Sequence, residues 1–244
     1  MTDSVRFACA IARVTGTEEK SGIGTLSEKP LHKILKYYFE PDESKHEIKI
    51  FDSVADVFDG NEIFEIQTGG FLPLVKKLKK FLPEYRVTLV HPIIAEKNLI
   101  WIDKETGEMS EPKKSPKRGR YTDVLSELYQ LSEIFPQEKL TVKLLLLSAD
   151  EYKYLDGCGE SKKQKATKIA RLPKRLLGEY DLKTVSDVAE MLPPLPTPFT
   201  AKDFSKTLVI RGRRSYYALK VLCSLGIAEK VGKDKNAFLY RLLY

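Results

Sequence analysis

The pattern of apolar and polar residues divides the first part of the chain into helices and strands that alternate. Apolar side chains at helical spacing predict a helix over about residues 28–39, with Glu28 in its first turn. An acid there is explained equally well by the helix dipole or by a functional role. Residues 46–51 alternate apolar and polar side chains, which predicts a strand.

Residues 54–68 carry the most informative pattern, because two short alternating runs flank the turn Asp59-Gly60-Asn61, a strong signal for a β-hairpin. Side chains alternate between the faces of a strand, so Asp56 is expected to lie near Glu65 and Gln67 on the next strand. Carboxylates on apolar strands cost free energy unless they are paired or bind a metal. A hard divalent cation held by oxygen ligands explains them most simply, and an ion pair of Asp56 with Lys49 is the alternative.

Beyond the hairpin, helices and strands continue to alternate: helices at 72–81 and 121–134, and strands at 86–94, 99–102 and 140–147. The last of these strands is apolar on both faces, as in a sheet covered on both sides. Helices interleaved with a buried sheet indicate an α/β fold. We expect this domain to span residues 24–156, preceded by residues 1–23 as a loosely ordered arm or an added strand.

The pattern changes after residue 156. Residues 157–198 are rich in basic residues and proline, and we interpret them as a linker. In residues 199–244, Thr200 and Asp203 have the spacing of a capping box at the start of one helix, and a second helix is predicted from Arg213 to Leu225. Two short strands follow. Helix, turn, helix and hairpin predict a small C-terminal winged helix-turn-helix domain.

Composition narrows the class of protein. The chain has 244 residues, 42% of them hydrophobic and 31% charged, which is typical of a globular protein and not of a membrane protein. Three scattered cysteines without metal spacing favour the reducing cytoplasm. No glycine-rich loop has the spacing that binds nucleotide phosphates, so no nucleotide cofactor is expected.

Charge is distributed unevenly along the chain. Residues 1–150 hold 22 Lys and Arg against 24 Asp and Glu, whereas residues 151–244 hold 19 against 10. An acidic first part joined to a basic second part indicates a cation site coupled to a surface for polyanions. The alternative explanation of the basic second part is that its charges lie on solvent-exposed loops and bind nothing.

The first domain resembles the PD-(D/E)XK nuclease superfamily, and within it the CoiA-type competence nucleases and the Holliday-junction resolvases. Glu28, Asp56 and the sequence Glu65-Ile66-Gln67 carry the resemblance, which covers about residues 24–105. It implies a restriction-endonuclease-like mixed sheet flanked by helices. It also implies Mg²⁺ (or Mn²⁺) bound by Asp56, Glu65 and the backbone carbonyl of Ile66, with Glu28 reaching a metal and Gln67 orienting water or phosphate.

Gln67 departs from the superfamily, because a lysine usually stands at this position. An amide cannot supply the positive charge that a lysine offers to the transition state. A basic residue from elsewhere (Lys49, Lys97 or Lys113) or a second metal would have to replace it, or the site would be slow.

Candidate DNA contacts cluster in three places. The start of the second C-terminal helix offers side chains suited to phosphates and base edges, the hairpin of the winged helix adds two lysines, and a basic loop lies near residue 115. These candidates are Arg211, Arg213, Arg214, Ser215 and Tyr216; Lys233 and Lys235; and Lys113, Lys114, Lys117 and Arg118.

The sequence therefore predicts a cytoplasmic, Mg²⁺-dependent DNA endonuclease that a basic winged helix brings to DNA. Cleavage of both strands calls for two active sites, which favours a homodimer. A non-catalytic DNA-binding or regulatory protein with a degenerate nuclease core is the alternative, supported by Gln67. In a third interpretation, the winged helix docks onto proteins.

Overall fold

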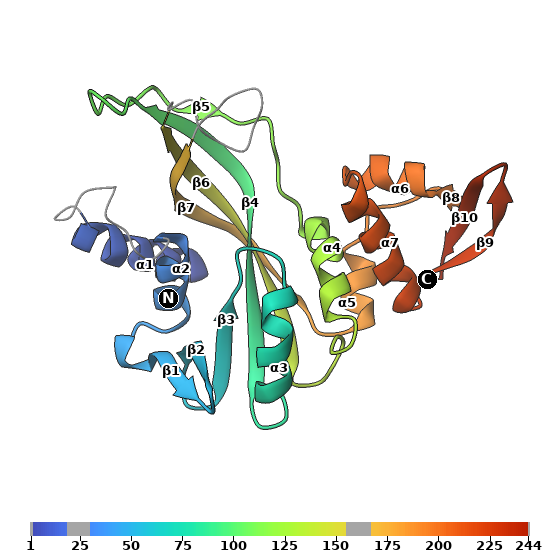
Figure 1. Cartoon of the computed structure of the whole chain (residues 1–244), viewed down its shortest axis with the longest axis horizontal. Coiled ribbons are helices and arrows are strands. Elements are labelled where there is room, and N and C mark those ends of the chain that lie inside the picture. Colours follow the sequence, from blue (N-terminus) through green and yellow to red (C-terminus); the bar gives the residue numbers. More distant parts are fainter. Residues whose placement is uncertain (1, 19–29, 155–166, 244) are drawn as a thin grey trace. The chain divides into compact units, whose positions relative to one another are not determined.

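A computed structural model describes residues 2–18, 30–154 and 167–243 and shows an α/β fold with a mixed seven-stranded sheet flanked by helices. The chain divides into two compact units, and the long strands β4 (Arg86–Ile102), β6 (Leu140–Tyr154) and β7 (Thr167–Leu182) contribute to both. Figure 1 labels the elements along the chain. Within the described ranges, no helix is both long enough and apolar enough to cross a lipid bilayer.

The first unit comprises residues 1–68, 91–120 and 145–179. Its remaining elements are α1 (Asp3–Glu18), α2 (Pro30–Phe39), the 3-10 helix η1 (Glu43–Lys45), β1 (His46–Ile50), β2 (Ser53–Phe58), β3 (Glu62–Ile66) and β5 (Lys113–Lys114). The sheet order is β1-β2-β3-β4-β6-β7, and β5 pairs with β4. The chain thus passes from α2 through an antiparallel meander of β1, β2 and β3.

The predicted hairpin is confirmed. β2 and β3 pair antiparallel with Val57 opposite Phe64 and Phe58 opposite Ile63. Asp59 is the turn residue that the sequence indicates, because its Oδ1 accepts the N–H groups of Asn61 at 2.8 Å and Glu62 at 2.7 Å. Gly60 has a φ of 103°, which other residues rarely adopt, so the turn requires glycine there.

The N-terminal segment is not an arm or a strand, as the sequence analysis expected, but the helix α1. Phe7, Ala10 and Val14 are buried at helical spacing, and the Phe7 ring meets Tyr38 of α2 edge to face at 5.4 Å. The Arg6 side chain donates a hydrogen bond to the Tyr38 carbonyl at 3.1 Å. Apolar burial and these cross-helix bonds fix α1 against α2.

The second unit comprises residues 69–90, 121–144 and 180–244. Its elements are η2 (Leu72–Leu74), α3 (Val75–Phe81), η3 (Tyr121–Val124), α4 (Leu125–Leu128), η4 (Tyr129–Leu131), α5 (Val185–Glu190), β8 (Phe199–Thr200), α6 (Ala201–Leu208), α7 (Arg213–Ser224), β9 (Ala228–Asp234) and β10 (Ala237–Leu242). The helix predicted at residues 121–134 is therefore broken into η3, α4 and η4.

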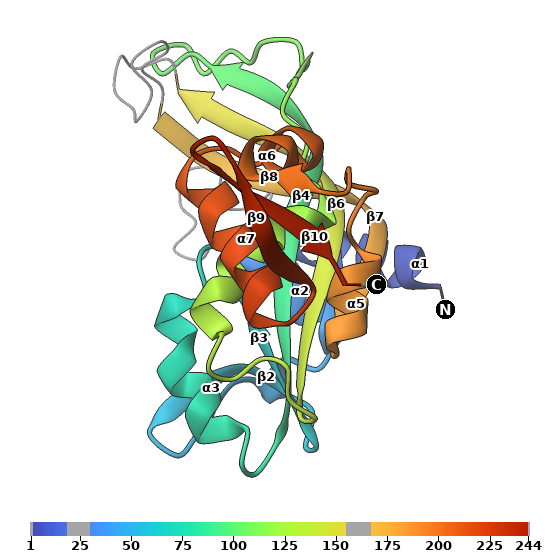
Figure 2. The same ribbon diagram turned by 90° about the vertical axis from the view of Figure 1, so that its right-hand side faces the viewer.

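The C-terminal elements follow the predicted order of two helices and a hairpin. Thr200 and Asp203 form the predicted capping box at the start of α6. β9 and β10 pair antiparallel, and β8 adds a third strand in the order β8-β10-β9. Figure 2 shows α6, α7 and this small sheet from a second side. β9 extends to Asp234, so the turn of the hairpin is shorter than the sequence indicated.

Two further predictions of elements are wrong. The strands expected at 86–94 and 99–102 form the single strand β4. The segment 157–198, interpreted as a linker, contains the 16-residue strand β7. Helix α5 follows it, where the sequence pattern also indicates a short helix. Residues 155–166 lie outside the described residues, as does Glu28, for which a role at the metal was expected.

Candidate functional site

Asp56 and Glu65 lie together where the β2–β3 ladder ends. The Asp56 N–H points to Glu65 Oε1 at 3.4 Å, and the Ile66 N–H donates to Asp56 Oδ2 at 2.7 Å. In the register of this antiparallel pair, Asp56 and Glu65 are the next two residues beyond the pair Val57–Phe64. The two carboxylates that the sequence singled out are thus neighbours across one pair of strands.

Two histidines approach the same residues. His32 Nε2 of α2 is 3.2 Å from Asp56 Oδ2, and His91 Nδ1 of β4 is 2.7 Å from the backbone oxygen of Gln67. We use the name Asp56 site for Asp56, Glu65, Ile66, Gln67 and His32. His32 and Asp56 are 24 residues apart in sequence, and only the fold brings them together.

Burial differs between the two carboxylates. Glu65 is 1% exposed, whereas the Asp56 side chain is 22% exposed. A carboxylate buried as deeply as Glu65 requires hydrogen bonds or a cation to offset the loss of water. Lys49, the alternative partner proposed for Asp56, sits on β1 opposite Val54 and makes no ion pair in the described part of the chain.

Hard oxygen donors at the Asp56 site suit Mg²⁺ or Mn²⁺: two carboxylates and the carbonyl of Ile66. Among the described residues, no three His, Cys, Asp or Glu side chains are arranged to hold a metal ion. A complete ligand set therefore requires the backbone carbonyl, water, or a residue outside the described ranges such as Glu28.

A second cluster of charges lies further along the same unit. Glu151 on β6 is 3% exposed and is held by Lys97 at 2.9 Å, Arg171 at 2.7 Å and Lys153 at 3.2 Å. We call these four residues the Glu151 cluster. Burial by itself would raise the pKa of Glu151, but hydrogen bonds and charges from Lys97 and Arg171 bring the pKa down to about 2.

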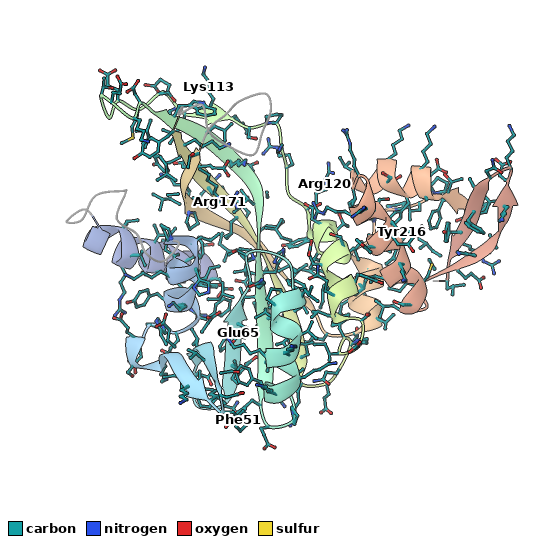
Figure 3. All side chains as sticks on the ribbon, viewed as in Figure 1. Phe51, Glu65, Lys113, Arg120, Arg171 and Tyr216 are labelled. Carbon is teal, nitrogen blue, oxygen red and sulfur yellow. The ribbon has the colours of Figure 1, made fainter. Side chains whose placement is uncertain are left out.

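Lys97 is therefore committed to Glu151 and is not a substitute for the lysine missing at Gln67. Figure 3 labels one residue of each group: Glu65 of the Asp56 site, on β3, and Arg171 of the Glu151 cluster, on β7. Lys113 and Lys114 form β5, where Leu99 and Asn98 of β4 are their partners. Arg118 pairs with Glu96 at 2.8 Å, and Lys117 is exposed.

The predicted recognition helix α7 has two different sides in the second unit. Arg214 donates to Ser126 Oγ at 3.1 Å and to the Asp123 carbonyl at 3.1 Å, while Tyr217 stacks on Tyr129 with ring centroids 4.7 Å apart. Ser215, proposed to contact DNA, is only 8% exposed. One side of the start of α7 thus packs within its own unit.

Other candidates for DNA contact remain at the surface. Arg211, Arg213 and Tyr216 are exposed, and Tyr216 is 64% exposed. Lys233 and Lys235 of the hairpin are exposed too, and Lys233 lies over the Phe238 ring at 4.7 Å.

Comparison with known proteins places the chain in a family. A family described as "Domain of unknown function (DUF8091)" matches residues 29–183, which include the Asp56 site and the Glu151 cluster. A protein of Treponema pallidum (strain Nichols), described as uncharacterized, is 31% identical over 222 residues, covering 90% of this chain and 87% of that protein. No solved structure matches the chain. The chain belongs to the DUF8091 family.

Proposed function

We propose that this protein is a metal-dependent deoxyribonuclease in which the Asp56 site holds Mg²⁺ or Mn²⁺. The observation that carries the proposal is the pairing of Asp56 and Glu65 at the end of the β2–β3 ladder. The order α2, β1, β2, β3, α3, β4 supports it, because the PD-(D/E)XK core has the same succession of one helix, three antiparallel strands, one helix and one strand.

Each residue of the site has a distinct task in this proposal. The carboxylates of Asp56 and Glu65 and the carbonyl of Ile66 bind the ion. When bound, the ion polarises the scissile phosphate and acidifies the attacking water. The Gln67 amide orients that water or a phosphate oxygen. His32, at 3.2 Å from Asp56 Oδ2, fixes the direction of the Asp56 carboxylate.

DNA would be held by the C-terminal elements, which we propose to be a winged helix. The exposed residues Arg211, Arg213 and Tyr216 at the start of α7 are suited to phosphates and bases, and the lysines of the hairpin to the backbone. Arg214 and Ser215 are engaged or buried within the unit, so we propose no DNA contact for them.

Cleavage of plasmid and branched DNA with Mg²⁺ or Mn²⁺ tests the proposal. Asp56→Asn and Glu65→Gln are expected to reduce the rate by at least about 100-fold, because even indirect supports of a metal site cost 10–100-fold. Glu62→Gln is the matched control, since residue 62 lies on the same strand but points to the other face. Cleavage that persists in both site variants would refute a nuclease at this site.

A non-catalytic DNA-binding protein is the second candidate. The hydrogen bond that the Ile66 N–H donates to Asp56 favours it. A side-chain carboxylate that accepts a backbone N–H at the end of a pair of strands can stabilise the fold without binding a metal. In that case, purified protein binds DNA without cleaving it, and Mg²⁺ changes neither DNA binding nor stability.

A further inference from the structure

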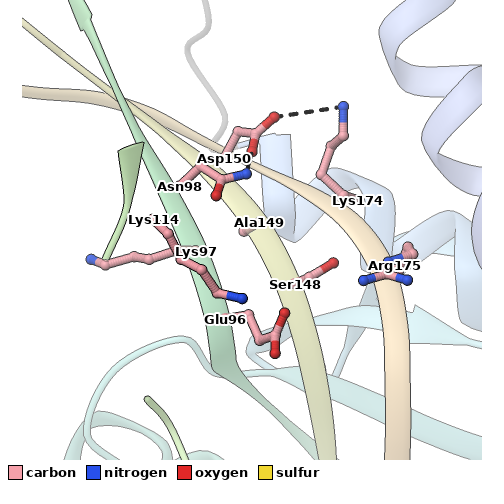
Figure 4. A pocket seen from close by; sticks show the side chains of 9 residues that line it. All are labelled: Glu96, Lys97, Asn98, Lys114, Ser148, Ala149, Asp150, Lys174 and Arg175. Carbon is pink, nitrogen blue, oxygen red and sulfur yellow. Dashed lines mark hydrogen bonds and ion pairs between the residues drawn. The ribbon is translucent and has the colours of Figure 1, made fainter. Parts of the chain in front are cut away.

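A pocket of about 330 Å³ opens in the first unit among residues of β4, β5, β6 and β7 (Figure 4). Four basic side chains line it: Lys97, Lys114, Lys174 and Arg175. Its volume lies at the lower end of the range of small-ligand sites. Lys114 is also one of the candidate DNA contacts named from the sequence.

The two acids in the lining already have partners. Glu96 pairs with Arg118 at 2.8 Å. Asp150, which is 7% exposed, accepts a hydrogen bond from the Asn98 amide at 3.0 Å and lies 3.5 Å from Lys174. Among the described residues, Lys114 and Arg175 have no carboxylate partner within ion-pair distance. The pocket therefore keeps an excess of positive charge after its internal pairs are counted.

Ser148 supplies a second and independent indication of a ligand. Only 8% of this residue is exposed, and its buried Oγ has no hydrogen-bond partner. Figure 4 shows this hydroxyl directed from β6 toward β7, where Lys174 and Arg175 border the pocket. A buried hydroxyl without a partner costs free energy, which a bound acceptor would recover.

We propose that this pocket binds a phosphate group, with Lys114 and Arg175 supplying charge and the Ser148 hydroxyl donating a hydrogen bond. Phosphate oxygens accept hydrogen bonds from all three types of donor. The identification of DNA as the source rests on the proposed function. Along β4, Lys97 at the pocket lies six residues, or about 20 Å, beyond His91, which contacts Gln67 of the Asp56 site. A duplex rising 3.4 Å per base pair covers that length in about six base pairs, so a single short duplex is long enough to extend from one end of this stretch to the other.

Titration calorimetry with inorganic phosphate tests the pocket directly. The titration uses the Asp56→Asn variant without added metal, so the result does not depend on whether the Asp56 site is a nuclease. Binding is expected to weaken at least about tenfold in the double variant Lys114→Ala/Arg175→Ala. Ser148→Ala should also weaken binding, and it should unfold at equal or higher urea concentration because an unpaired buried hydroxyl is removed. Lys104→Ala, which removes an exposed lysine just after β4 and outside the pocket lining, should leave binding unchanged.

No binding of phosphate to the parent protein, or equal affinity in the double variant, would overturn the proposal. A labelled DNA duplex then identifies the source of the phosphate. If it is DNA, the double variant lowers duplex affinity and reduces the slope of log affinity against log salt by about 2. If duplex affinity is unchanged while phosphate binding is lost, the pocket serves a free phosphate compound.

Discussion

The Asp56 site and the Glu151 cluster lie in the same unit but have opposite balances of charge. In the first, two carboxylates lie side by side, with His32 and backbone N–H groups among their partners. In the second, three cations surround a single buried carboxylate. The comparison teaches that a buried acid is not by itself a sign of function. Whether such an acid stabilises the fold or is able to bind a ligand depends on the charge of the groups that surround it.

Glu151 illustrates the stabilising case. Its cations lie on three different strands, with Lys97 on β4, Lys153 on β6 and Arg171 on β7. One carboxylate therefore joins three neighbouring strands of the sheet, and no metal is needed to balance its charge. Oδ2 of Asp56, on β2, instead contacts β3 through the Ile66 N–H and helix α2 through His32.

Removing the charge of Glu151 is expected to have the largest effect on stability. Glu151→Gln leaves three partly buried cations without their carboxylate, which typically costs about 3–5 kcal/mol. Urea unfolding measures the loss. Glu96→Gln, which breaks the half-exposed pair with Arg118, is the control and should cost about 1 kcal/mol or less. A loss for Glu151→Gln no greater than that of the control would remove the distinction between the two clusters.

Acid should weaken the fold through the same residue. Because the folded pKa of Glu151 is about 2, below the ordinary value of 4.5, its contribution to stability is complete above about pH 4.5. The contribution falls as the pH drops toward 2, by up to about 3 kcal/mol for a shift of this size. Unfolding free energies at pH 5 and pH 3 should therefore differ more in the parent protein than in Glu151→Gln. Equal differences would mean that other groups cause the acid sensitivity.

Asp56→Asn should cost less, about 1 kcal/mol, because the amide oxygen still accepts the Ile66 N–H. Added Mg²⁺ or Mn²⁺ should raise the unfolding free energy of the parent protein but not of this variant. A loss as large as that of Glu151→Gln, with no response of the parent to metal, would make Asp56 a structural residue.

The smallest effect on stability is expected for Arg213 at the start of α7. Arg213→Ala should weaken DNA binding at moderate salt and leave stability unchanged, since the side chain is exposed. Arg214→Ala should instead reduce stability by about 1 kcal/mol, since its hydrogen bonds go to Ser126 and the Asp123 carbonyl. A loss of stability in Arg213→Ala together with a loss of DNA binding in Arg214→Ala would contradict this assignment of the two sides of the helix.

The Asp56 hairpin could be predicted because its signals are local. The turn at Gly60 and the alternation of side chains determine which residues face each other. His32 could not be predicted, because its distance from Asp56 depends on how α2 packs on the sheet. The continuity of β4 was missed for a similar reason. Its charged positions Glu96 and Lys97 look like a break, yet each is paired with a residue distant in sequence.

Strand β7 was mistaken for a linker because its composition is that of a solvated segment. It lies at one end of the sheet order, where basic residues on an edge strand are common because they prevent pairing with other chains. Arg171 and Lys174 are partly exposed to solvent, and they also form ion pairs with Glu151 and Asp150 of the neighbouring strand β6. No local pattern distinguishes such a strand from a basic loop.

Binding of Mn²⁺, measured by titration calorimetry on the parent protein, on Asp56→Asn and on Glu62→Gln, tests the central claim most directly. The account predicts one saturable site in the parent and in Glu62→Gln, and its loss in Asp56→Asn. No binding to the parent protein, or equal binding to all three, would contradict a metal site at Asp56 and Glu65.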